Sequence, residues 1–173
     1  MRGRWLVLAG VLLAACDVGG LPRPGVPGIE APTSAALILS REGLSVPGAA
    51  AGEISFGRAM PGVVEAVRRL KGAPLGEPQT NAECGAGPVT AVRFRDGLTL
   101  NFMNGAFLGW VADAPGAGAA PNGLKVGDAW PPPGAAAQET TLGSEAEVAG
   151  VQVLSRDGGR VDLLFAGVTC FFR

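Results

Sequence analysis

Two pairs of acidic residues are the side chains whose spacing could support catalysis. Glu145 and Glu147 lie two positions apart, and Glu83 and Asp96 flank a predicted strand. Two carboxyl groups on either side of a glycosidic bond can hydrolyse it, one as the acid and the other as base or nucleophile. Neither pair is accompanied by an aromatic platform motif, and Ser144 before Glu145 is typical of the capped first turn of a helix. We therefore expect no catalytic residue and no enzyme; a carboxylate-dependent envelope hydrolase is the alternative.

Other kinds of site lack the residues they need. The 173-residue chain contains no His, which excludes the Ser-His-Asp triad, the Cys-His dyad and His-dependent zinc sites. It has no P-loop and no GxGxxG motif, so we expect neither cofactor nor metal. The 14 basic and 15 acidic residues nearly balance, which argues against nucleic acid as a partner. Arg68, Arg69 and Lys71 cluster on a predicted helix, where we interpret them as its solvated face.

The N-terminus has the pattern of a secretory signal. Arg2 and Arg4 form a short positive region, and Trp5–Leu13 is almost wholly apolar. This apolar run is shorter than the roughly 20 residues that cross a bilayer. Small residues follow it, as they do before a cleavage site. We predict a signal peptide over residues 1–15, which leaves 173 minus 15, or 158, residues.

Residues 13–16 carry a more specific signal. Their sequence, Leu-Ala-Ala-Cys, resembles the lipobox of bacterial lipoproteins. The resemblance implies a diacylglycerol on Cys16, cleavage just before it and palmitate-type acylation, whereas the alternative is a secreted protein with a chance cysteine. Several acyl chains on one cysteine give a lasting membrane anchor. We expect a lipid-anchored protein that faces the periplasm, and Asp17 resembles the inner-membrane retention signal of enteric lipoproteins.

Two further cysteines, Cys84 and Cys170, remain in the exported part of the chain. An even number of cysteines in an oxidising compartment indicates a disulfide. We predict a Cys84–Cys170 bridge, and the alternative is a pair of buried free thiols.

The rest of the chain divides into a tether and one domain. Residues 16–36 are rich in Pro and Gly and predict a flexible tether. Residues 37–173 predict a single α+β domain, in which Pro61 begins a helix and Gly72 ends it. Asp96-Gly97 and Asn104-Gly105 predict tight turns of an antiparallel meander over 89–111.

Several less regular segments follow the meander. Residues 112–121 are small and Gly-rich, which predicts a linker. Further strands are predicted over 124–126, 150–154, 160–165 and 168–172.

A shift of 70 positions aligns two blocks of the chain. It places residues 54–61 on 124–131, where Gly, Ala and Pro match, and residues 97–102 on 167–172, where Gly, Thr and Phe match. We therefore predict two related units, 54–111 and 124–173. The expected fold is α+β, an antiparallel meander sheet with one or two short helices.

Two resemblances accompany this pattern. The helix ending at Gly72-Ala73-Pro74, followed by Cys84 and the meander, is similar to the SmpA/OmlA lipoprotein domain and to the β-lactamase inhibitor protein, which carries such a unit twice. Residues 81–88, 97–102 and 169–173 resemble short proteobacterial lipoproteins whose members carry no assigned activity. This likeness brings no activity with it. Because no catalytic motif is present, we expect a membrane-anchored, non-enzymatic binding or assembly module with an envelope protein as its partner.

Overall fold

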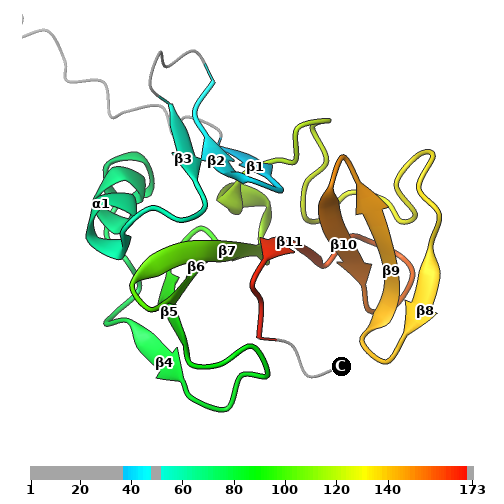
Figure 1. Ribbon diagram of the computed structural model, residues 1–173. Coiled ribbons are helices and arrows are strands. Elements are labelled where there is room, and N and C mark those ends of the chain that lie inside the picture. Colours follow the sequence, from blue (N-terminus) through cyan, green and yellow to red (C-terminus); the bar gives the residue numbers. More distant parts are fainter. Residues whose placement is uncertain (1–36, 48–51, 171–173) are drawn as a thin grey trace, which may run out of the picture. The chain divides into compact units, whose positions relative to one another are not determined.

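The computed structural model describes residues 37–47 and 52–170 (Figure 1). The predicted signal peptide (1–15), the lipidation site Cys16 and the tether (16–36) lie outside the described residues. In the part of the chain that is described, no helix is both long and apolar enough to cross a membrane.

The main element is an eight-stranded sheet in which all neighbouring strands are antiparallel, in the order β4-β5-β6-β7-β11-β10-β9-β8. Each half is a four-stranded meander, and the halves meet where β7 pairs with β11 (Figure 1). The strands are β4 (Gln79–Asn81), β5 (Val89–Arg93), β6 (Leu98–Met103), β7 (Ala106–Ala112), β8 (Gln138–Thr140), β9 (Gly143–Val148), β10 (Val151–Ser155) and β11 (Leu163–Gly167).

A smaller sheet and a helix complete the fold. The small antiparallel sheet contains β1 (Ile38–Ser40), β2 (Gly43–Ser45) and β3 (Glu53–Ser55). The helix α1 (Met60–Lys71) has a proline in its first turn and ends at Gly72, as the sequence predicts. Together with the short 3₁₀ helix η1 (Pro115–Ala117), these elements confirm the predicted α+β class with a meander sheet.

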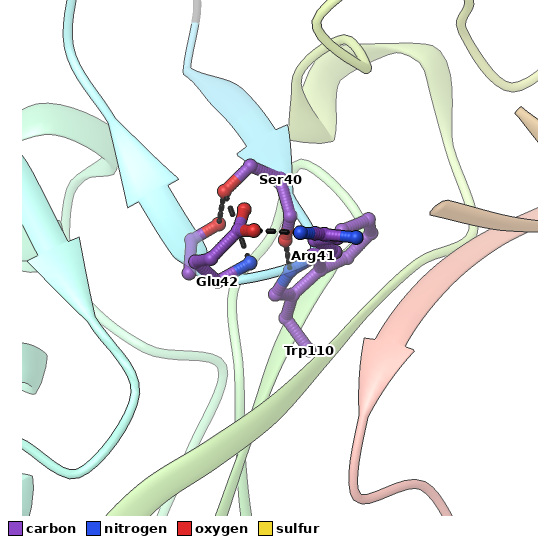
Figure 2. Close-up of polar contacts among 5 residues, drawn as sticks. Ser40, Arg41, Glu42 and Trp110 are labelled. Atoms are coloured by element: carbon purple, nitrogen blue, oxygen red, sulfur yellow. Dashed lines mark hydrogen bonds and ion pairs between the residues drawn. The ribbon is translucent and has the colours of Figure 1, made fainter. Parts of the chain in front are cut away.

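The core lies on one face of the eight-stranded sheet, under α1 and the small sheet. Strand alternation directs Leu100 and Trp110 to this face, where Val63 and Val67 of the helix join them. The indole N–H of Trp110 donates a hydrogen bond of 2.8 Å to the carbonyl of Ser40, the last residue of β1 (Figure 2). Phe107 and Trp110 are fully buried in this core.

Some sequence predictions were wrong. Residues 124–126 form no strand, and residues 112–121 are not a free linker, because Ala117 and Ala120 are buried in the core. Residues 143–148 form β9 rather than the helix start predicted at Ser144, because cross-strand pairing with β8 and β10 outweighs the local capping pattern.

The two halves of the chain share one local geometry at the predicted offset. The Gly57 amide donates to the Phe107 carbonyl at 2.7 Å, and the Gly127 amide donates to the Val161 carbonyl at 2.8 Å. The two glycines are 127 minus 57, or 70, positions apart, whereas their acceptors are 161 minus 107, or 54, positions apart. The second half is therefore 16 residues shorter between these points.

The difference in length explains why the second alignment is wrong. Gly97 lies in the turn before β6, but Gly167 ends β11, so the two occupy unrelated places in the sheet. In the second half, the place of α1 is taken by a segment with Pro131, Pro132 and Pro133, and prolines remove the amides that a helix needs. One offset cannot describe both blocks, and the duplication itself stays a prediction.

Candidate functional site

The predicted acidic pairs do not form a catalytic arrangement. Glu83 precedes β5 and Asp96 follows it, so these two residues lie at opposite ends of that strand. Glu145 and Glu147 do share one face of β9, but each is held by a neighbour. The Thr140 hydroxyl donates to Glu145 at 2.8 Å, and the Gln152 amide donates to Glu147 at 2.9 Å.

The sheet face opposite the core, which we call the outer face, carries one continuous row of side chains. Cross-strand pairing joins Arg93, Thr99, Val111, Phe165, Gln152 and Glu147 in this order across β5, β6, β7, β11, β10 and β9. The row is basic at one end, acidic at the other and apolar in its middle. Neighbours in such a row lie close enough to be contacted together by one ligand.

A shallow depression marks each end of the outer face. The first, of about 350 Å³, is lined by Leu75, Gln79, Arg93 and Thr99, among others. Leu75 is 50% exposed, which is unusual here for a large apolar side chain. The Arg93 guanidinium binds the Asp113 carboxylate at 2.7 Å, which orients it at this edge.

The second depression lies at the acidic end of the row. It has a volume of about 360 Å³ and is lined by Gln138, Thr140, Glu145, Glu147 and Gln152, among others. Carboxylate and carboxamide groups dominate this lining, so it suits donors of hydrogen bonds and cationic groups.

An apolar cluster separates the two depressions. Leu154, Leu163 and Phe165 of β10 and β11 form it, and Val111 and Leu142 pack against them. These side chains point away from the main core, because their neighbours along the strands, such as Val153 and Leu164, point into it.

The segment that follows β11, residues 168–170, crosses the outer face, and we call it the strap. The Val168 amide donates to the Leu108 carbonyl at 2.8 Å, and the Asn101 side-chain amide donates to the Val168 carbonyl at 2.9 Å. Gly109, which pairs with Asn101, leaves room for the strap, because a Cβ there would overlap the Val168 backbone. A glycine inside a strand is typical of such a close backbone approach.

The strap corrects one sequence prediction. Residues 168–170 do not continue as the strand predicted over 168–172, and residues 171–173 lie outside the described residues. The signals for a crossing segment were present in the sequence as Asn101 on the polar face of β6 and Gly109 within β7. Only the register shows that these two residues lie opposite each other.

Both cysteines predicted to pair lie at the far end of the strap. Cys84, which is buried, and Cys170, which is half-buried, are free thiols in the structure. A hydrogen bond with Cys84, together with burial, raises the pKa of the Cys170 thiol to about 11. The Asn81 side-chain amide donates to the Cys170 sulfur at 3.3 Å. The two thiols therefore meet, and the disulfide between them stays a prediction.

Replacing Gly109 with Ala tests the contact between the strap and the sheet. The new Cβ would overlap the backbone of Val168, so the strap must shift or detach. We expect a loss of about 1–3 kcal/mol in the free energy of unfolding. Chemical denaturation measures this loss, and alkylation of Cys170 should become faster.

Gly62→Ala is the matched control, because a Cβ at Gly62 in α1 meets nothing within 4 Å. This substitution should leave stability unchanged or raise it by up to about 1 kcal/mol. Equal stabilities and equal Cys170 alkylation rates for the two variants would show that the strap is not seated on Gly109.

Comparison with protein-family models, curated proteins and solved structures gives no match to this chain. The resemblances suggested by the sequence therefore stay expectations. Within residues 37–47 and 52–170, no three His, Cys, Asp or Glu side chains gather in a way that could hold a metal ion.

Proposed function

We propose that this protein is a membrane-anchored, non-enzymatic binding or assembly module of the bacterial envelope, and that its outer face binds a partner protein. The observation that carries the proposal is the row from Arg93 to Glu147, which presents charges of opposite sign at its two ends, on either side of a largely buried apolar centre. Opposed charges orient a partner on such a face and set its specificity more than its affinity.

The charges at the two ends of the row indicate which kind of partner segment each end would bind. The exposed Glu147 suits a basic segment, whereas Arg93 and the exposed Leu75 suit an acidic segment that carries an apolar side chain. The non-enzymatic part of the proposal is supported by the carboxylates themselves. Glu145 and Glu147 already accept hydrogen bonds from Thr140 and Gln152, and they line an open depression rather than flank a deep cleft.

Photocrosslinking in native membranes tests this proposal. A photoreactive amino acid placed at Thr99, which is half-buried beside Arg93 in the row, should capture a specific protein. Glu147→Lys should lower the yield of that adduct about tenfold or more, because it places like charge opposite the basic segment of the partner.

Glu53→Lys is the control for this charge reversal, because Glu53 is exposed on the small sheet and away from the outer face. It should leave the adduct unchanged. Equal loss in both variants, or no specific adduct at all, would contradict the proposal. An envelope hydrolase activity that disappears in Glu147→Gln would instead favour the carboxylate enzyme.

A further inference from the structure

The strap has two attachments of different kinds. Near β11 it is held by two hydrogen bonds. The Val168 amide donates to the Leu108 carbonyl, and the Asn101 side-chain amide donates to the Val168 carbonyl. At its far end Cys170 lies beside Cys84, which belongs to the loop between β4 and β5. The strap therefore spans the outer face from the centre of the sheet to its β4 edge.

Oxidation or reduction can change the attachment at the Cys170 end of the strap. Cys84 and Cys170 are both free thiols, and each is the sulfur neighbour of the other. No other cysteine is present after residue 16. Oxidation of this pair would therefore join the strap to the loop of β4 and β5 within one chain.

We propose that Cys84 and Cys170 form a redox clasp, whose oxidation locks the strap over Asn101 and Gly109 and whose reduction lets the strap leave the outer face. The clasp then regulates access to the Arg93 end of the outer face, and only this consequence rests on the proposed function. Thr99, which lines that end, lies two residues before Asn101 on β6.

The chemical step is thiol–disulfide exchange with a disulfide oxidant such as oxidised glutathione. One cysteine thiolate attacks the glutathione disulfide, which forms a mixed disulfide and releases one glutathione thiol. The second cysteine then displaces the other glutathione and forms the Cys84–Cys170 bond. The two cysteine thiols lose two protons and two electrons, and oxidised glutathione gains them as two thiols.

The environment of Cys170 lowers the rate at which Cys170 itself attacks a disulfide. Because the pKa of Cys170 is raised to about 11, its thiol is protonated at neutral pH and attacks slowly. Oxidation and alkylation of Cys170 should both become faster as the pH rises toward that value.

Hydrogen exchange of the full-length mature protein in detergent tests the clasp. The protein is oxidised with oxidised glutathione or reduced with dithiothreitol, and a linked Cys84–Cys170 peptide should appear only after oxidation. The Val168 amide, which is bonded to Leu108, should exchange at least about tenfold more slowly in the oxidised form. The Ala119 amide, which is bonded to Leu37 away from the strap, should be unaffected.

The matched variant is Cys170→Ser, which keeps a hydrogen-bonding group of similar size but cannot be oxidised. Its Val168 exchange should not respond to oxidant. The clasp is overturned if oxidation yields no intramolecular bridge, or if the bridge forms and Val168 exchange does not change.

Crosslinking at Thr99 then separates the two proposals. A yield that is higher in the reduced protein supports regulation by the clasp, whereas equal yields in the two states overturn it. If neither state gives a specific adduct, the proposed function fails, and the exchange of Val168 still decides whether the clasp holds the strap.

Discussion

Replacing Cys16 with Ser should release the protein from membranes and remove the mass of the lipid. The reason is that Ser offers no thiol for the diacylglycerol, and the apolar run Trp5–Leu13 is shorter than the roughly 20 residues that span a bilayer. The expected change is from almost wholly membrane-bound to mostly soluble protein, because multiple acyl chains are what make such an anchor lasting. Membrane fractionation and intact mass spectrometry measure the two effects.

Cys84→Ser is the control for this experiment, since it also removes one thiol but leaves residues 13–16 intact. It should remain membrane-bound and should keep its lipid mass. Unchanged fractionation and unchanged mass in Cys16→Ser would rule out lipidation at this residue.

Replacing Lys71 with Met should strongly destabilise the fold. The Lys71 side chain is only 2% exposed, and its ammonium lies 2.8 Å from an Asp96 carboxylate oxygen. The same ammonium donates to the Gly116 carbonyl at 2.7 Å, so it joins the end of α1 to the β5–β6 turn and to η1. This burial corrects the sequence prediction that Lys71, like Arg68 and Arg69, belongs to a solvated helix face.

The expected loss follows from leaving a carboxylate without its partner. Breaking a buried ion pair from one side costs roughly 3–5 kcal/mol. Because Asp96 is 21% exposed, water screens it in part, and we expect about 2–3 kcal/mol for Lys71→Met. For a domain of this size the melting temperature should fall by roughly 5–10 °C. Thermal unfolding followed by circular dichroism measures the change.

Arg69→Met is the matched control, because it removes another long cation from the same helix. Arg69 is 73% exposed and pairs with Glu65 at the surface, so its loss should cost less than about 1 kcal/mol. Adding Asp96→Asn to Lys71→Met should recover part of the stability, because Asn is neutral and its oxygen can still accept from the Leu98 amide. Equal losses for Lys71→Met and Arg69→Met would contradict the buried ion pair.

The sequence by itself determined those elements whose information is local. Pro61 and Gly72 marked the ends of α1. Proline is tolerated in the first turn of a helix, and glycine readily adopts the positive φ that is common just after the last helical residue. Asn104 and Gly105 both have positive φ, as expected for the predicted tight turn. In β6 the apolar residues Leu98, Leu100 and Phe102 alternate with Thr99 and Asn101, and the apolar residues lie in the core, because successive side chains of a strand point to opposite faces.

Tertiary structure decided whatever depends on residues that are distant in the chain. Ser144 and Glu145 carry a helix-start pattern, yet pairing with Gln138 and Leu154 made this segment a strand. The burial of Lys71 depends on Asp96 and Gly116, which no local pattern associates with it. The physical reason is that hydrogen bonds within a turn or helix are set by neighbours in sequence, whereas sheet register, buried ion pairs and close backbone approaches are set by the packing of the whole domain.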